Sequence, residues 1–222
     1  MAIKIYGVAV STCTKRVITT LLEKEVPYEL ITIDWSKAEH KQPEHLRKHP
    51  FGKVPVLEDD GYFVFESRAI CKYIAKKFAG QGTKLIPDSQ DDRGYGLFEQ
   101  ASLALSYHAC SIETSYFNTP AEGIADEKAF KAYRGETTDE AAVVKYVAKL
   151  DAALATYDTI LSKQAYLAGN DVSLADLFHL PYGQLAKDLG HKDLFEKYPN
   201  VDRWFQQLQS RASWVQANSA TL

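Results

Sequence analysis

Hydrophobic and polar positions change their period several times along the first eighty residues. Residues 2–6 alternate in the manner of a β-strand, and the alternation stops at Gly7. From Thr14 the apolar positions recur at helical spacing, with Ser11 and Thr12 before them as candidate N-terminal caps. The same two periods predict strand 28–33, a short polar helix 43–49, strand 54–57, strand 62–65 after an Asp60-Gly61 turn, and helix 66–78. The order β-α-β-α-β-β-α predicts a small sheet flanked by helices.

A stretch rich in glycine and polar residues, 80–92, separates this pattern from a second one. Beyond it every periodic segment has helical spacing: residues 93–118, 139–162, 173–187 and 201–210. Ser173 and Asp176 have the spacing of a capping box, which we assign to folding and not to catalysis. The predicted fold class is α/β plus all-α, with a first domain over 1–79, a linker over 80–92 and an all-helical domain over 93–222.

Composition and charge argue against several function classes. Of 222 residues, 45% are hydrophobic and 25% charged, as in ordinary globular proteins. No apolar run approaches the roughly 18 residues of a membrane span, and Lys4 interrupts any signal-peptide core. Three widely spaced cysteines, Cys13, Cys71 and Cys110, indicate a reducing compartment. The net charge of −3 gives no reason to expect nucleic acid as a partner, but residues 1–79 hold 13 Lys and Arg against 10 Asp and Glu, which favours a small anionic ligand.

The start of the first predicted helix is the first candidate for chemistry. Ser11 follows a strand and a short loop, so its hydroxyl is expected beside unpaired backbone N–H groups, a position that favours an anion. The alternative is an ordinary helix cap. Cys13 lies in the first turn, where the helix dipole favours a thiolate, although free cysteines are also common as small buried fillers.

Two further segments suggest how a ligand would be held. Pro55 cannot donate to a sheet, so Val54-Pro55 marks the beginning or the edge of a strand, and such an edge can pair with an extended peptide. The alternative is a tight loop. Glu66 and Ser67 begin a helix, where a side-chain oxygen and free N–H groups can hold an ammonium and a carboxylate. Both residues are also good caps.

Three of the six histidines, His40, His45 and His49, fall within ten residues. Their spacings do not place all three on one helical face, and no cysteine is near. Neighbouring positive charges at Lys37, Lys41, Arg47 and Lys48 also repel cations. We therefore expect no metal site here but a solvated basic segment, in which His40 and Lys41 can meet a ligand carboxylate.

Taken in order, these motifs resemble those of one enzyme family. The first domain contains Ser11-Thr12-x-Thr14-x-Arg16, Glu39-His40-Lys41, Pro50-Phe51-Gly52-Lys53-Val54-Pro55 and Phe65-Glu66-Ser67-Arg68-Ala69-Ile70. The second contains Tyr166-Leu167-Ala168-Gly169-Asn170-Asp171 and Ser173-Leu174-Ala175-Asp176-Leu177-Phe178-His179-Leu180-Pro181. Together they resemble a cytosolic glutathione transferase of the serine-type phi class, and the similarity covers nearly the whole chain.

The resemblance implies a thioredoxin-like N-terminal domain, an all-helical C-terminal domain and a homodimer. It also implies glutathione as co-substrate, no bound cofactor and no metal. Ser11 matches the family's catalytic serine, whose hydroxyl donates a hydrogen bond to the glutathione sulfur and stabilises its thiolate. The implied glutathione-binding residues are Ser11, Thr12, His40, Lys41, Lys53, Val54, Pro55, Glu66 and Ser67.

Each part of glutathione has its expected partners in that set. Glu66 and Ser67 match residues that hold the γ-glutamyl end, and Val54, ahead of a presumed cis proline, pairs through its backbone with the cysteinyl unit. His40, Lys41 and Lys53 match positions around the glycyl carboxylate. Position 53 departs from the phi pattern, which usually has glutamine there; lysine supplies a full charge but no acceptor.

The electrophile is expected to meet the sulfur in an apolar hollow between the domains. Val10, Tyr107, Ser111 and Phe117 are its candidate walls, of which Phe117 matches best by resemblance. Apolar residues on a long helix can equally be plain core. Phe51, beside a loop, is a candidate anchor for the dimer.

The leading hypothesis is therefore a cytoplasmic homodimeric enzyme that conjugates glutathione to small hydrophobic electrophiles, with reduction of organic hydroperoxides as a further activity. Neither nucleic acid nor membrane is an expected partner. Two alternatives stay open. One is a glutathione-dependent thiol transferase that uses Cys13 as nucleophile; the other is a ligand-binding protein that keeps the fold without turnover.

Overall fold

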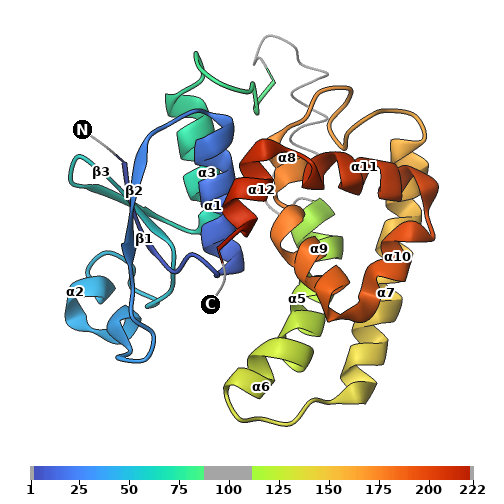
Figure 1. Cartoon of the computed structure of the whole chain (residues 1–222), viewed down its shortest axis with the longest axis horizontal. Coiled ribbons are helices and arrows are strands. Elements are labelled where there is room, and N and C mark those ends of the chain that lie inside the picture. The colour runs from blue at the N-terminus through green and yellow to red at the C-terminus, as the bar shows by residue number, and fades with distance from the viewer. Residues whose placement is uncertain (1–2, 88–111, 221–222) are drawn as a thin grey trace. The chain divides into compact units, whose positions relative to one another are not determined.

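The computed structural model describes residues 3–87 and 112–220, which fall into two compact units (Figure 1). The first unit contains residues 1–86 and 210–222, and the second contains residues 87–209. The sequence pattern assigns residues 93–222 to one helical domain. The structure differs at the C-terminus, because the last helix, α12 (Ala212–Asn218), packs against α1 (Thr12–Glu23) of the first unit.

A four-stranded sheet forms the centre of the first unit. Its strands, in the order β2-β1-β3-β4, are β2 (Tyr28–Thr32), β1 (Ile3–Gly7), β3 (Val56–Asp59) and β4 (Tyr62–Phe65). β1 pairs in parallel with β2, whereas the other two pairings are antiparallel. Parallel neighbours need a crossover connection, and α1 supplies it. The hairpin turn at Asp60-Gly61 joins β3 to β4, as the sequence predicts.

Helices α1 and α3 (Ser67–Lys77) lie side by side against one face of this sheet (Figure 1). Their apolar stripes face inward: Val17, Leu21, Ile70 and Ile74 are fully buried. The unit also contains a 3₁₀ turn (Glu39–Lys41) and the short helix α2 (Pro43–Leu46). Burial of these stripes, together with the sheet, gives the unit its core.

The described part of the second unit is helical. Its elements are π-helical Glu113–Asn118, α5 (Thr119–Ala125), π-helical Asp126–Phe130, α6 (Lys131–Tyr133), α7 (Glu140–Leu161), α8 (Leu174–Leu177), α9 (Leu180–Ala186), π-helical Lys187–His191, α10 (Lys192–Glu196) and α11 (Pro199–Gln209). Residues 173–187, expected as one helix, are divided between α8 and α9. The fold class, a mixed sheet with helices followed by an all-helical region, is confirmed.

The carboxylate of Asp176 lies at the centre of the second unit's core and is fully buried. It accepts hydrogen bonds from the backbone N–H groups of Leu167 and Ser173, each at 2.9 Å, and from Trp204 Nε1 at 3.0 Å. The Ser173 hydroxyl donates to the same carboxylate at 2.9 Å. These contacts tie the start of α8 to α11 and the preceding loop, which is the folding role that the capping-box spacing indicates.

Among residues 3–87 and 112–220, no helix combines the length and the apolar character needed to cross a membrane.

Candidate active site

Sheet topology brings the three segments that the sequence predicts to bind a ligand to one end of the sheet. Tyr6, near the end of β1, pairs with Val56 at the start of β3, and Val56 pairs in turn with Phe65 at the end of β4. The loop after β1, the segment before β3 and the start of α3 therefore share this end. These segments contain Ser11, Val54 and Glu66.

Ser11 is the N-cap of α1, with extended backbone dihedrals of φ −65° and ψ 130°. Its N–H donates to the carbonyl of Val8 at 2.9 Å, and its own carbonyl accepts from the N–H of Lys15 at 2.8 Å. Its half-buried hydroxyl makes no capping bond and has no hydrogen-bond partner among the described residues. The backbone of Ser11 thus starts the helix, and its hydroxyl makes no hydrogen bond in the described fold although it lies at the positive end of a twelve-residue helix.

The segment before β3 presents an open backbone. The Val54–Pro55 peptide bond is cis, as the resemblance implies. No hydrogen bond involves the N–H or C=O of Val54 within the part of the chain that the structure describes. Partly buried backbone groups of this kind ordinarily have partners. Val54 can therefore receive an extended peptide by strand-like pairing.

Two side chains hold the loop that precedes Val54. Lys41 Nζ donates to the carbonyls of Gly52 at 2.9 Å and Phe51 at 3.3 Å. His45 Nε2 lies 2.7 Å from the Lys53 carbonyl and, because a carbonyl only accepts, carries the proton of that hydrogen bond. Lys41 therefore positions the loop as well as supplying charge, whereas the exposed Lys53 side chain has no partner among the described residues.

The start of α3 has an unusual backbone. Glu66 is its N-cap at φ +68°, a conformation that residues other than glycine rarely adopt and that clusters at functional sites. Its side chain is exposed. Ser67 beside it is buried, and its hydroxyl accepts a hydrogen bond from Arg16 Nη1 at 2.9 Å. The proton of Ser67 thus remains available for an acceptor such as a carboxylate.

Arg16 lies beside the candidate site residue Ser67, although hydrophobic periodicity gives no sign of it. It lies on α1 with 1% of its surface exposed, and besides Ser67 its Nη1 lies 3.7 Å from Cys13 Sγ. A charged residue in an amphipathic helix is expected in solvent, so periodicity gives no signal for this burial. The only signal is its place in the Ser11-to-Arg16 motif.

The remaining predicted residues take different positions. Val10, Thr12 and Cys13 are half-buried in the first unit. Cys71 is fully buried, and burial raises the pKa of its thiol to about 11, so it is not a candidate nucleophile. Tyr107, Cys110 and Ser111 lie outside the described residues.

Phe117 is fully buried in the second unit, packed against His179 at 4.6 Å between ring centroids. Its ring also stacks on Tyr157. In the described part of that unit it has the position of a core residue, which is the alternative that helical spacing leaves open.

The histidine segment consists of partly or fully buried rings. Burial, with the nearby charges of Lys41 and His45, lowers the pKa of His40 below 6.5, so its ring is mostly neutral at pH 7. His49 packs against Phe65 at 4.7 Å between ring centroids, and burial lowers its pKa as well. Within residues 3–87 and 112–220, no three His, Cys, Asp or Glu side chains are arranged to hold a metal ion.

Comparisons with known proteins agree with this arrangement of an N-terminal unit built on a sheet and a helical unit. The family model for the glutathione S-transferase N-terminal domain matches residues 1–76, and that for the C-terminal domain matches residues 111–212. Glutathione S-transferase hmp2 of Hypomyces subiculosus is 49% identical over 220 residues, which cover 99% of each chain.

Solved structures are similar over the same length. Glutathione transferase F7 of Populus trichocarpa superposes with a TM-score of 0.90 at 35% identity and 97% coverage of both chains. Glutathione S-transferase I of maize, solved with an atrazine glutathione conjugate, superposes with a TM-score of 0.87 at 30% identity, covering 99% of this chain and 97% of that one. The plant F-type relatives confirm the resemblance to the phi class. The chain belongs to the glutathione S-transferase family.

Proposed function

We propose that this enzyme transfers the thiolate of glutathione to small hydrophobic electrophiles and that Ser11 is its catalytic residue. The observation that carries the proposal is that the Ser11 hydroxyl makes no capping hydrogen bond, although Ser11 is the N-cap of α1. A hydroxyl in this position donates to an anion, and a thiolate is the anion that the reaction needs.

The required stabilisation is within reach of one hydroxyl. A free thiol with a pKa of about 8.5 is only about 3% thiolate at pH 7. A pKa of about 6.5 raises this to about three quarters and needs roughly 2.7 kcal/mol of preferential stabilisation. A hydrogen bond to a charged group contributes about 1.5 to 3 kcal/mol, and a helix terminus adds up to about 1 kcal/mol. Ser11 therefore acts as a hydrogen-bond donor and need not be a base.

The open end of the sheet supports a binding mode for the whole tripeptide. The cysteinyl unit pairs with the backbone of Val54, ahead of Pro55, and so delivers its sulfur toward the loop of Ser11 and Thr12. The γ-glutamyl end lies at the start of α3. There Ser67, which accepts from Arg16, donates its own proton to the ligand carboxylate.

The glycyl carboxylate is the third part of the ligand. We assign it to the exposed ammonium of Lys53 together with His40 and Lys41. Two donors of Lys41 Nζ already hold the carbonyls of Phe51 and Gly52, so Lys53 is the principal charge for this carboxylate. Lysine here in place of the usual glutamine of the phi pattern supplies attraction at longer range.

The electrophile, the assembly and the compartment belong to the same proposal. Val10 is the described candidate for the electrophile site, while Tyr107 and Ser111, two further candidate walls, lie outside the described residues. The maize relative was solved with an atrazine conjugate of glutathione, which supports small hydrophobic electrophiles as substrates. Organic hydroperoxides are a second class that a bound thiolate can attack.

A cytoplasmic homodimer is the expected state of the protein, with Phe51, 68% exposed, as the candidate anchor of the dimer.

The contact between Arg16 and Cys13 favours one alternative activity. Arg16 Nη1 lies 3.7 Å from Cys13 Sγ, and this contact supports Cys13 as the nucleophile of a glutathione-dependent thiol transferase. Deglutathionylation that persists in Cys13→Ser contradicts this alternative. Retention on immobilised glutathione without turnover of any electrophile would instead support a ligand-binding protein.

The test of the main proposal compares wild type with Ser11→Ala and Ser11→Thr. With a generic aryl halide at pH 7 we expect kcat/KM to fall about 25-fold in Ser11→Ala, because the thiolate fraction falls from about three quarters to about 3%. Ser11→Thr keeps a hydroxyl and should recover part of the rate. Ser36→Ala, at an exposed position of the same unit, is the control. Equal rates in wild type and Ser11→Ala would remove Ser11 from the mechanism.

A further inference from the structure

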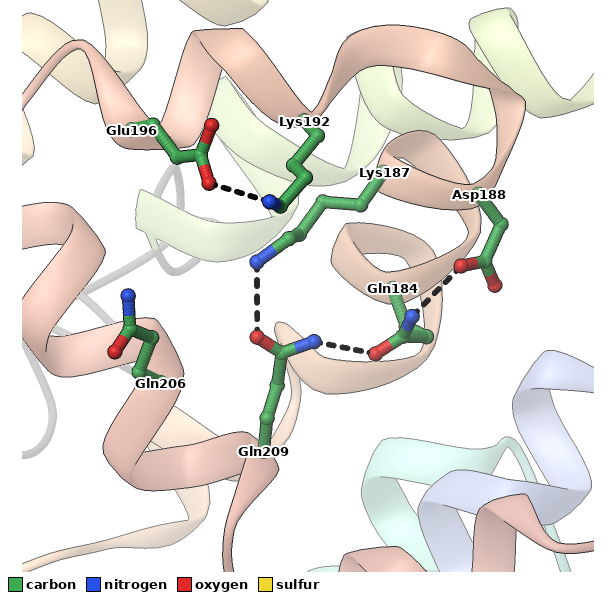
Figure 2. Close-up of a pocket in the computed structure, with 7 residues that line it drawn as sticks. All are labelled: Gln184, Lys187, Asp188, Lys192, Glu196, Gln206 and Gln209. Carbon is green, nitrogen blue, oxygen red and sulfur yellow. Dashed lines mark hydrogen bonds and ion pairs between the residues drawn. The ribbon is translucent and has the colours of Figure 1, made fainter.

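A polar cavity of about 420 Å³ lies in the second unit among α9, the π-helical turn after it, α10 and α11 (Figure 2). Its volume falls within the range of small-molecule sites, about 300 to 1,000 Å³. It is lined by Gln184, Lys187, Asp188, Lys192, Glu196, Gln206 and Gln209. None of these residues belongs to the proposed glutathione site, so an inference about the cavity stands independently of the proposed function.

A chain of oriented side chains runs along one wall of the cavity (Figure 2). Lys187 Nζ donates to Gln209 Oε1 at 2.9 Å, and Gln209 Nε2 donates to Gln184 Oε1. Gln184 Nε2 then donates to Asp188 Oδ1 at 2.8 Å. An ammonium at one end and a carboxylate at the other fix the direction of both amides. The wall therefore presents donors and acceptors at defined positions.

Lys187 is the central group of the cavity. Its ammonium lies 5.2 Å from the ring centroid of Phe205 and 5.7 Å from that of Phe195, and both rings are buried. No carboxylate forms a salt bridge with it among the described residues, and one of its three N–H donors is used, by Gln209. Burial, assisted by Lys192, lowers the pKa of Lys187, while the charges of Asp202, Glu196 and Asp188 act in the opposite direction. Two donors of a partly desolvated cation thus remain for a ligand, and an anionic acceptor suits them best.

The other charges of the cavity select the charge of that ligand. Lys192 Nζ bonds Glu196 at 2.7 Å, and Figure 2 shows this pair above the Lys187 ammonium. Two lysines and two carboxylates line the cavity, and Asp202, whose carboxylate accepts a hydrogen bond from Gln206 Nε2 at 2.8 Å, brings the formal charge of the group to −1. A monoanion bound to Lys187 raises the excess negative charge to two, whereas a dianion raises it to three beside Asp188, Glu196 and Asp202. A carboxylate therefore fits better than a doubly charged phosphate.

The remaining polar groups of the cavity indicate which uncharged groups the ligand carries. The amides of Gln206 and Gln209 and the carboxylate of Glu196 face the same space as the ammonium (Figure 2). The rings of Phe195 and Phe205 are fully buried beneath Lys187 and offer no apolar surface to a ligand. Hydroxyl groups, which both donate and accept, match such walls.

We propose that this cavity binds a small polyhydroxylated monocarboxylate of the sugar-acid type. Its carboxylate accepts hydrogen bonds from Lys187 and Lys192, and its hydroxyls bond the amides of Gln206 and Gln209 and the carboxylate of Glu196. The site is a binding site for a polar metabolite, separate from any site for a hydrophobic electrophile.

The test is isothermal titration calorimetry of the full chain with four matched probes. D-gluconate carries both features, D-glucose the hydroxyls alone, acetate the carboxylate alone, and glucose 6-phosphate a dianion with hydroxyls. We expect saturable millimolar or tighter binding of gluconate that exceeds the binding of the other three. Absence of gluconate binding, equal binding of acetate, or preference for glucose 6-phosphate each overturns the proposal.

Two variants then locate the binding. Lys187→Met keeps the aliphatic stem over the rings and removes the charge, and Gln209→Glu places a competing carboxylate beside the ammonium. Both should weaken gluconate binding at least about tenfold, the value of one charge-assisted hydrogen bond. Lys163→Met, an exposed lysine of the same unit outside the cavity, should not. Thermal melting verifies that each variant folds, and unchanged gluconate affinity in both cavity variants refutes the site.

Discussion

Two serines at helix starts show how the two units use the same residue type differently. Ser173 begins α8 in the second unit, where its N–H and its hydroxyl both bond the buried carboxylate of Asp176. Ser11 begins α1 in the first unit, where its hydroxyl makes no capping bond. The side chain of Ser173 is bonded within the fold, and that of Ser11 is the one that we propose for a ligand.

The difference extends to the surroundings of each serine. Asp176 has four donors from three segments of the second unit. At the end of the sheet where we propose that glutathione binds, by contrast, the backbone of Val54 lacks a partner among the described residues and Glu66 adopts a positive φ. Satisfied polar groups stabilise a structure, whereas strained backbone conformations are concentrated at functional sites.

The largest expected effect is on stability and concerns Asp176, the partner of Ser173. Asp176→Ala leaves buried donors of Leu167, Ser173 and Trp204 without their acceptor, so we expect the free energy of unfolding to fall by about 4 kcal/mol. Urea denaturation measures it. Asp171→Ala, at an exposed position nearby, should change stability by less than about 0.5 kcal/mol. Similar small losses of unfolding free energy in both variants would contradict the structural role given to Asp176.

The next largest effect on stability is expected at Glu23, the last residue of α1. Burial alone would raise its pKa, but hydrogen bonds from Arg211, Ser213 and Thr83 and the charge of Arg211 bring it below 4.5. Glu23→Gln should cost about 2 kcal/mol at neutral pH, the scale of hydrogen bonds to a charged group.

The pH dependence of that loss has a definite sign. Because the folded-state pKa of Glu23 lies below its unfolded value, its carboxylate stabilises the fold above about pH 4.5, and this contribution is lost as pH falls through the folded pKa. Denaturation of wild type and Glu23→Gln between neutral and acidic pH should therefore show converging stabilities. A difference that stays constant to the lowest pH contradicts the assignment.

Ser173→Ala should have a smaller effect, about 1 kcal/mol, because it removes one helix-cap side chain and leaves the backbone bond to Asp176. Its kcat/KM should match that of wild type. Denaturation and the aryl-halide assay on the same sample test both statements. Loss of activity in a folded Ser173→Ala protein would show that this serine is not purely structural.

The smallest expected effect is the stability change of Ser11→Ala, less than about 0.5 kcal/mol, since no bond within the described fold is lost. Its activity should nonetheless fall more than that of any other variant that remains folded. A destabilisation as large as that of Ser173→Ala would show that Ser11 caps its helix in solution and would weaken the contrast between the two serines.

Much of the fold could be predicted, because the hydrophobic period and the turn residues that specify a helix or a strand lie within the segment itself. The segment Tyr62–Phe65, predicted from the Asp60-Gly61 turn before it, coincides with β4, and the apolar stripe of residues 66–78 coincides with α3 to within one residue at each end. Helices α5 and α6 were not predicted. Proline and glycine within residues 119–135 interrupt the helical period there, whereas in the structure Gly123 lets the ring of Tyr146 pack directly on its backbone.

Individual residues of the candidate site could be predicted from the sequence, but the contacts between them could not. Sequence motifs predict Ser11, Val54 and Glu66 as site residues, each by its place at the edge of an element, and the structure places all three at one end of the sheet. The burial of Arg16 and its bond to Ser67 depend on the packing of α1 against α3, and the return of α12 to α1 depends on a contact made across most of the chain. Neither leaves a periodic signal, because each arises from tertiary contacts alone.

The most direct test of the account is the titration of the thiol of enzyme-bound glutathione, followed by the ultraviolet absorbance of its thiolate. We predict a pKa of about 6.5 in wild type and a return toward about 8.5, the value of a free thiol, in Ser11→Ala. A bound thiol that titrates like free glutathione in wild type, or a lowered pKa that survives in Ser11→Ala, would contradict the central role given to the Ser11 hydroxyl.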